Sequence, residues 1–228
     1  MTEFAFSVSL MTEVLDHIKN SKDVSINSIK EMYDSWVPTY DEDLRKHNYR
    51  YPAKASEIIS EHFSDKNVSI LDCGAGTGLV GVELYRLGFK NIAAVDISSK
   101  SLAAAEKKGV YKKLVCAEVG KGTLPFDDKC FDAVMCSASF MPTHIRPECL
   151  PELVRIVKPG GIIVVLMAQR YIEVVAGDEE CFCKYYQLEF EEVTQDLEGS
   201  KKWKLISKNV IPNLMLNKAA LTFVWKVL

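Results

Sequence analysis

Short apolar runs alternate with longer amphipathic segments through the middle of the chain. Five runs have the length of buried β-strands, and segments 79–87 and 98–108 between the first three of them have helical spacing. A further helix is expected to precede the fifth run and to end at 158–161, because proline and glycine stop helices. The predicted strands lie at 68–71, 92–95, 114–117, 133–136 and 162–167. This alternation predicts a mostly parallel sheet with helices on both faces.

Both ends of the chain depart from this alternation. Apolar positions at helical spacing over about 8–32 predict short amphipathic helices, and an aromatic-rich stretch with a further helical pattern follows up to residue 59. After a polar helical segment at about 179–197, strands at 203–211 and 221–227 flank a turn region at 212–218, which predicts a hairpin on the sheet edge. We therefore expect one domain over 1–228. Its parts are a helical extension and lid (1–64), a core (65–170) and a C-terminal helix with the edge hairpin (171–228).

Composition narrows the kind of protein. A chain of 228 residues with 48% hydrophobic content can bury one sizeable core. Lys and Arg total 28 against 31 Asp and Glu, so no global positive field favours a nucleic acid or a membrane surface as partner. The seven cysteines are odd in number and lack zinc-ligand spacing, which indicates reduced thiols and no metal. We expect a monomer in the cytoplasm, with the nucleus as a second location.

A glycine-rich turn follows the first predicted strand. Glycines at 74, 76 and 78 leave the backbone open to a ligand, and Asp96 at the end of the second strand can accept hydrogen bonds from ribose hydroxyls. This spacing alone suits either NAD or another adenosine-containing cofactor. Asp72, two residues before the first glycine, adds a negative charge that suits a cationic sulfonium amino acid better than a pyrophosphate.

Four sequence blocks carry a resemblance to a known family. Segments 70–78, 94–98, 124–134 and 153–161 together resemble class I S-adenosylmethionine-dependent methyltransferases, and the resemblance covers about residues 65–170. It implies a Rossmann-like, seven-stranded, mostly parallel sheet whose last strand is antiparallel. Segments 33–44, 48–52 and 150–155 are similar, more narrowly, to the methyltransferase-like family named for the Williams-Beuren syndrome chromosome region.

The resemblance implies an S-adenosylmethionine site at the ends of the strands. Asp72 and the glycine turn are expected at the methionine part, Asp96 at the ribose, residues after the second and third strands at adenine, and Ser137 facing the sulfonium. Aromatic rings before the core, which attract cations with their π faces, are expected to form a lid over the sulfonium amino acid. The expected cofactor-binding residues are Trp36, Tyr40, Asp72, Gly74, Ala75, Gly76, Gly78, Asp96, Ile97, Glu118, Val119 and Ser137.

The expected activity is methyl transfer to a small-molecule acceptor by in-line displacement. Such a reaction can be accelerated by holding donor and acceptor in line in a dry pocket, without a mandatory base. His144 is the candidate catalytic residue, because an imidazole with a pKa of about 6.5 can take a proton from a nucleophile. A surface or helix-start role explains this histidine as well. Three alternatives stay open: a non-catalytic S-adenosylmethionine-binding regulatory protein, a protein methyltransferase and an NAD-dependent oxidoreductase.

Overall fold

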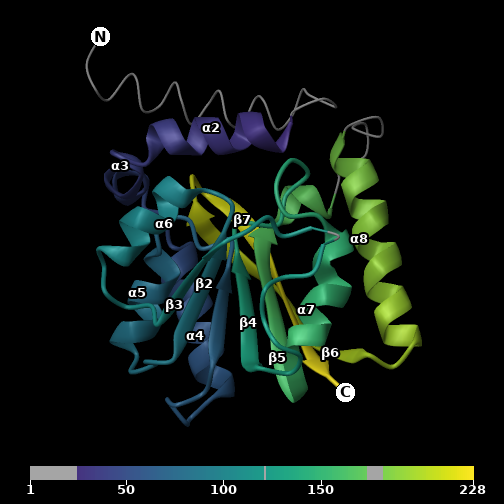
Figure 1. The fold of residues 1–228 in the computed structure, drawn as a ribbon. Helices are drawn as coiled ribbons and strands as arrows, with labels where there is room; N and C mark the ends of the chain where they lie inside the picture. Colours follow the sequence, from purple (N-terminus) through teal and green to yellow (C-terminus); the bar gives the residue numbers. More distant parts are fainter. Residues whose placement is uncertain (1–24, 121, 174–181) are drawn as a thin grey trace.

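A seven-stranded sheet forms the centre of the molecule (Figure 1). The structure, a computed structural model, describes residues 25–120, 122–173 and 182–228. The strand order is β3-β2-β1-β4-β5-β7-β6; β1 to β5 are parallel, and β7 runs antiparallel to both of its neighbours. This arrangement confirms the predicted fold class. The strands are β1 (Ile70–Cys73), β2 (Ile92–Asp96), β3 (Lys113–Cys116), β4 (Phe131–Ser137), β5 (Val157–Ala168), β6 (Trp203–Met215) and β7 (Lys218–Val227).

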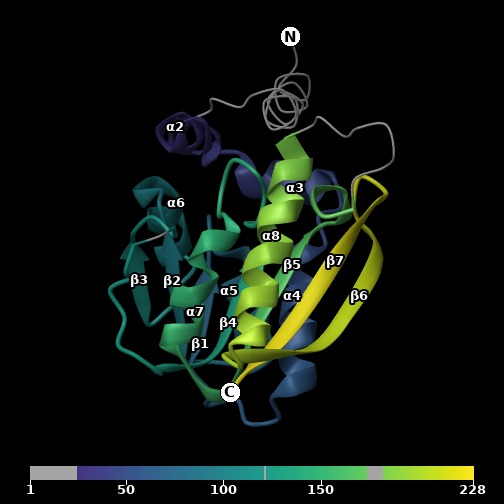
Figure 2. The ribbon, with the colours of Figure 1, turned by 90° about the vertical axis from the view of Figure 1, so that its right-hand side faces the viewer.

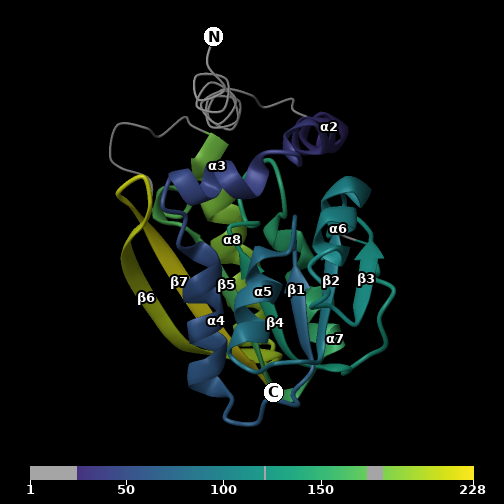
Figure 3. The same ribbon diagram turned by 90° about the vertical axis from the view of Figure 1, so that its left-hand side faces the viewer.

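Helices cover both faces of the sheet and one of its ends. α7 and α8 lie on one face (Figure 2), and α4 and α5 lie on the other (Figure 3). α2 and α3 lie across the carboxyl ends of the parallel strands (Figure 1). The predicted helices at 8–32 fall partly outside the described residues. The helices are α2 (Ile26–Trp36), α3 (Tyr40–Lys46), α4 (Tyr51–His62), α5 (Leu79–Arg86), α6 (Ser99–Glu106), α7 (Leu150–Ile156) and α8 (Phe182–Gly199), with single 3₁₀ turns at η1 (Pro147–Cys149) and η2 (Gln169–Tyr171).

Strand β1 shows why the predicted strands read as continuous apolar runs. Leu71 and Cys73 face the hydrophobic core under α7 and α8, whereas Ile70 faces the core under α4 and α5. All three side chains are fully buried. A parallel strand covered on both faces has no solvent side, so its sequence does not alternate between apolar and polar residues.

The first and fifth strands begin at other residues than predicted. β1 starts at Ile70, because the backbone N–H and the hydroxyl of Ser69 donate to the Asp132 carboxylate, both at 2.8 Å. β1 also ends later than predicted, at Cys73, so Asp72 lies inside the strand. Helix α7 ends at Ile156, two residues before the predicted 158–161 stop, and β5 begins directly after it. The register with β4 shifts between the pairs Phe131–Val157 and Ala133–Ile162, so the extra residues lie in β5 and include its proline and glycines.

The C-terminal hairpin is confirmed, but its predicted turn region at 212–218 is too long. β6 continues to Met215, and only Leu216 and Asn217 connect it to β7. Their φ angles of 47° and 55° are both left-handed, as two-residue hairpin turns require. Pro212 is tolerated inside β6 because this strand forms the edge of the sheet.

Candidate functional site

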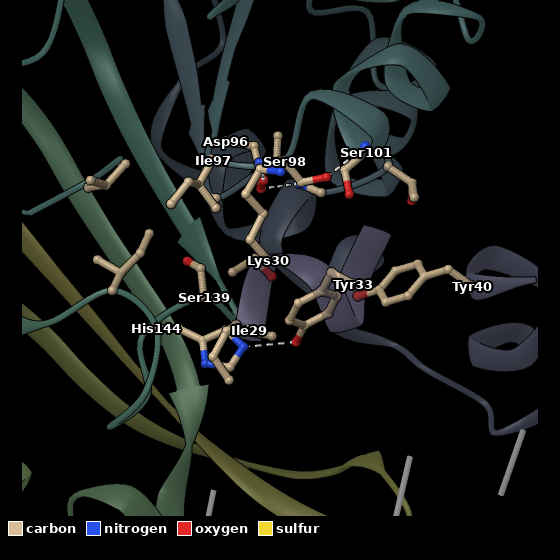
Figure 4. Close-up of a pocket in the computed structure, with 18 of the residues that line it drawn as sticks. Ile29, Lys30, Tyr33, Tyr40, Asp96, Ile97, Ser98, Ser101, Ser139 and His144 are labelled. Carbon is tan, nitrogen blue, oxygen red and sulfur yellow. Dashed lines mark hydrogen bonds between the residues drawn. The ribbon is translucent and has the colours of Figure 1, made fainter. Parts of the chain in front are cut away.

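A cavity of about 1060 Å³, including its mouth, opens where the parallel strands end (Figure 4). The turn after β1, the end of β2, the segment after β3 and the end of β4 form its inner walls, and α2 and α3 cover it. The strand order reverses at β1, which has β2 on one side and β4 on the other. Ligands of open α/β sheets bind at such a reversal, outside the carboxyl ends of the strands.

The glycine turn presents its backbone to the cavity through Gly74, Ala75 and Gly76. Gly74 has φ of +74°, and a Cβ built on it would lie 2.5 Å from the Cβ of Ser139. Gly76 has φ of +54°, and a Cβ built there would meet no atom within 4 Å. Glycine at 74 therefore lets the turn pack against the loop after β4, whereas glycine at 76 leaves open space on the ligand side.

Asp96 ends β2 with its carboxylate at the cavity wall. One carboxylate oxygen accepts from the N–H of Gly76 and the other from the N–H of Ser98, both at 2.8 Å. Burial raises the pKa of Asp96, while these backbone donors lower it. Each carboxylate oxygen has a second acceptor site, so the group can still bind hydroxyls of a ligand.

The segments after β2 and β3 form the next wall. Ile97 lies beside Asp96 and Ser98 at the end of β2 (Figure 4). Glu118, which is exposed, and Val119, which is buried, line the same wall after β3. The wall thus combines two aliphatic side chains with two carboxylates, a mixture that suits a flat heterocycle with a polar edge.

Ser137 is the last residue of β4 and is only 8% exposed. Ser137 lines the cavity, and its buried hydroxyl has no hydrogen-bond partner among the described residues. By contrast, the Ser139 hydroxyl donates to the carbonyl of Cys73 at 3.1 Å. Since buried polar groups are normally paired, the Ser137 hydroxyl is a candidate partner for a ligand bound beside it.

His144 and Tyr33 both line the cavity and are in contact with each other (Figure 4). A hydrogen bond of 3.0 Å joins His144 Nε2 to the Tyr33 hydroxyl, and one of 2.9 Å joins Nδ1 to the Thr143 hydroxyl. Burial lowers the pKa of His144 to about 4. The imidazole is therefore neutral at pH 7 and a weak base. An imidazole with the ordinary pKa of about 6.5 would accept a proton more readily.

Polar contacts attach the covering helices to the loops beneath them. Asp34 of α2 accepts from the Ser98 hydroxyl after β2. Asp41 of α3 accepts from the Thr77 hydroxyl in the glycine turn and pairs with the Lys108 ammonium at 2.7 Å. Together with the bond between Tyr33 and His144, these contacts fix the cover to the loops after β1, β2 and β4.

Three of the predicted site residues lie behind the cavity wall. Trp36 is 4% exposed and donates from Nε1 to the Asp43 carboxylate at 2.9 Å, with its ring against that of Tyr40. Asp72 is 1% exposed and accepts from the Tyr111 hydroxyl at 2.6 Å. Gly78 packs against the same tyrosine. Tyr40, Gly74, Ala75, Gly76, Asp96, Ile97, Glu118, Val119, Ser137 and His144 all line the cavity.

Sequence reasoning did not single out several other lining residues. Ile26 and Ile29 lie on the face of α2 that carries Tyr33, one of the aromatic rings expected in the lid, and this spacing of three and four residues could have marked that face as the one over the site. Tyr111, which lies behind the glycine turn and does not line the cavity, gave no signal in the sequence, since it lies far along the chain from the turn that it contacts.

Two negative observations apply to the part of the chain that the structure describes. No group of three His, Cys, Asp or Glu side chains there is arranged to hold a metal ion. None of the helices described combines the length and the apolar character that crossing a membrane requires.

Comparisons with known proteins agree with this geometry. Residues 71–165 match the family described as methyltransferase domain. Human methyltransferase-like protein 27 is 35% identical over 133 residues, which are 58% of this chain and 54% of that protein, so the match spans about half of the relative. Demethylmenaquinone methyltransferase of Chlorobaculum tepidum is 25% identical over 194 residues, covering 83% of this chain and 77% of the relative.

A solved structure extends the comparison to the whole fold. The 1,6-didemethyltoxoflavin-N1-methyltransferase of Burkholderia thailandensis superimposes with a TM-score of 0.61 at 14% identity, covering 91% of this chain and 92% of that one. The shared architecture includes the sheet and the helices around it. Residues 71–165 thus match a methyltransferase domain, and together with the glycine turn and the acidic end of β2 this match supports a class I S-adenosylmethionine-dependent methyltransferase.

Proposed function

We propose that the protein transfers a methyl group from S-adenosylmethionine to a small, uncharged acceptor by in-line displacement. The observation that supports this most is one cavity that extends from the glycine turn and Asp96 to the space between α2 and the loop after β4. Two ligands bound side by side in one cavity can be held in line, and together they displace water from it.

The residues present fit the cofactor. Asp96 offers acceptors for the ribose hydroxyls, and Ile97 and Val119 offer aliphatic surface to adenine. Gly76 leaves open space where a side chain would otherwise project. The Ser137 hydroxyl, which lacks a partner among the described residues, can bond to the cofactor or the acceptor. When bound, S-adenosylmethionine supplies an electrophilic methyl group on its sulfonium.

Apart from Lys30 of α2, the side chains at the acceptor end are uncharged. Ile29, Tyr33, Ser139 and His144 line it. Burial lowers the pKa of the His144 imidazole and raises that of the Tyr33 hydroxyl, so both groups are neutral. These groups can orient an acceptor by hydrogen bonds without removing its proton. Relatives named for quinone and toxoflavin precursors support a small acceptor.

Thermal unfolding with added ligands tests the cofactor. S-adenosylmethionine and S-adenosylhomocysteine should raise the melting temperature and NAD should not, because a ligand stabilises the folded state that binds it. Asp96→Ala should abolish the rise, whereas Asp127→Ala, which removes an exposed carboxylate elsewhere, should keep it. An equal rise with NAD would contradict the assignment.

Labelled cofactor tests the reaction. Incubation of the protein with methyl-labelled S-adenosylmethionine and a metabolite extract should yield a labelled small product, and incubation with a protein extract should not. Label on protein would instead support a protein methyltransferase. A second candidate, a regulatory protein that binds the cofactor without catalysis, is favoured by the weakly basic His144, and tight binding with no labelled product in either extract would support it.

The remaining proposals concern the protein as a whole. We propose a monomer in the cytoplasm and nucleus whose segments 1–64, 65–170 and 171–228 act as one domain. Sedimentation velocity measures the oligomeric state, cell fractionation the location, and a single cooperative unfolding transition the domain organisation.

A further inference from the structure

Tyr111 connects two parts of the glycine turn from behind. It lies between α6 and β3, and its hydroxyl donates to the Asp72 carboxylate at 2.6 Å. The same hydroxyl accepts from the backbone N–H of Gly81 at 3.1 Å. The tyrosine therefore joins the end of β1 to the first turn of α5, the two elements between which the glycine turn is held.

The Tyr111 ring occupies space that two glycines leave free. A Cβ at Gly78 would lie 2.8 Å from the Cε2 atom of Tyr111, and a Cβ at Gly81 would lie 2.2 Å from its Cζ atom. Neither glycine lines the cavity. The second half of the glycine motif thus makes room for this ring, whereas the first half faces the cavity.

The same connection replaces a missing helix cap. Gly78, the N-cap residue of α5, has no side chain to bond to the first free N–H groups of the helix. Tyr111 supplies an acceptor to one of them, at Gly81. Lys108 donates to the carbonyl of Thr77 at 2.6 Å. Residues 108–111 therefore hold the turn at both of its ends.

We propose that Tyr111 is a positioning residue of the cofactor site, whose hydroxyl holds the Asp72 carboxylate as an anion behind the glycine turn and so strengthens binding of a cationic cofactor. This inference rests on the proposed function. Asp72 lies behind the cavity wall, so its charge acts across the turn through a medium of low dielectric, where Coulomb attraction is stronger than in water.

Few groups share the titration of Asp72. Burial raises the pKa of Asp72 to about 7, the hydrogen bond from Tyr111 lowers it, and the charge of Asp96 raises it. The other titratable groups that interact with this carboxylate are Tyr49 and Cys136. Burial raises the pKa of both well above the ordinary values, so they stay neutral near pH 7. Among these groups, Asp72 therefore changes charge near neutral pH, and the pKa of Asp96 is also raised by burial.

Tyr111→Phe is the test variant, because it keeps the ring and removes only the hydroxyl. Titration of the Asp72 side-chain carbon by NMR, without cofactor, should show a midpoint about one to two pH units higher in the variant, since a hydrogen bond to a charged group contributes about that much. Calorimetry at pH 7 should show S-adenosylmethionine binding weakened about tenfold or more. Tyr85→Phe, which removes the hydroxyl of an exposed tyrosine on α5, should match the wild type in both measurements.

Asp72→Asn provides a second test if Tyr111→Phe does not fold. S-adenosylmethionine binding to the wild type should strengthen as pH rises through about 7, and Asp72→Asn should remove this dependence. Tyr111→Phe in the Asp72→Asn background should cause little further loss of affinity. An unshifted Asp72 midpoint in Tyr111→Phe, or a wild-type pH dependence in Asp72→Asn, overturns the role of Tyr111. Absence of cofactor binding by the wild type defeats the proposed function instead, and the NMR titration still tests the hydrogen bond.

Discussion

Replacing Asp72 by asparagine should stabilise the protein, and by an amount that depends on pH. Asp72 is 1% exposed, and burial raises the pKa of its carboxyl from 3.8 to about 7. A carboxyl whose pKa is higher in the folded chain contributes fully to stability only at pH values below its pKa in the unfolded chain. As pH rises toward the folded value, the unfolded chain releases a proton that the folded chain retains, so stability is lost. Above about pH 7 the loss is constant.

The size of the effect follows from the two pKa values. Keeping the carboxyl buried costs the folded state about 2 kcal/mol at pH 5 and about 4 kcal/mol at pH 8, at about 1.4 kcal/mol for each pKa unit. An asparagine amide is nearly isosteric, does not titrate, and can still accept the hydrogen bond from Tyr111. The stability difference between Asp72→Asn and wild type should therefore grow by about 2–3 kcal/mol between pH 5 and pH 8.

Urea denaturation at several pH values measures this difference through the free energy of unfolding. Asp127→Asn is the control, because it makes the same change at an exposed position, and it should follow the wild type across the range. A difference between Asp72→Asn and wild type that stays constant with pH would refute the reasoning. It would mean that Asp72 titrates alike in the folded and unfolded chains.

Three further predictions concern the glycine turn, the cover and the acceptor end. Gly74→Ala should lower the free energy of unfolding by about 1–3 kcal/mol and abolish cofactor-induced stabilisation, whereas Gly109→Ala, also at positive φ but with open space around it, should cost about 1 kcal/mol and leave binding intact. Trp36→Phe should cost about 1.5–3 kcal/mol in thermal or urea unfolding, because it removes the hydrogen bond to the Asp43 carboxylate. His144→Gln should reduce turnover at least about tenfold, with cofactor affinity unchanged in calorimetry. The wild-type rate should show no inflection near pH 6.5, since burial lowers the pKa of this imidazole to about 4. An inflection there would indicate that His144 acts as a general base.

The sheet could be predicted from the sequence because its strands are covered on both faces. Runs such as 162–167 are apolar without alternation, and helical patterns between them leave few topologies other than a parallel sheet. The chain positions of Gly76 and Asp96 also place them together, since parallel strands bring their carboxyl ends to one edge. Local sequence was sufficient for these features because each depends on one element and its neighbour.

The errors came from places where tertiary contacts decide. The Asp132 carboxylate binds Ser69, so β1 starts later than its apolar run. Leu216 and Asn217 form the hairpin turn without a glycine, and only their pairing strands show that both must be left-handed. The sequence marked His144 as a candidate catalytic residue. The burial that lowers its pKa depends on α2, however, which lies more than a hundred residues earlier in the chain.

The glycine turn depends both on its local sequence and on tertiary contacts. Its pattern of glycines predicted a ligand, and the structure divides the pattern by direction: Gly74 and Gly76 line the cavity, while Gly78 and Gly81 receive the ring of Tyr111. The carboxylate of Asp72 lies on the tyrosine side. A buried acid that costs the fold several kcal/mol when ionised is retained more readily if its charge serves binding. The hydroxyl of Tyr111 ties that charge to the turn, so cofactor affinity and the pH dependence of stability should change together in variants of this pair.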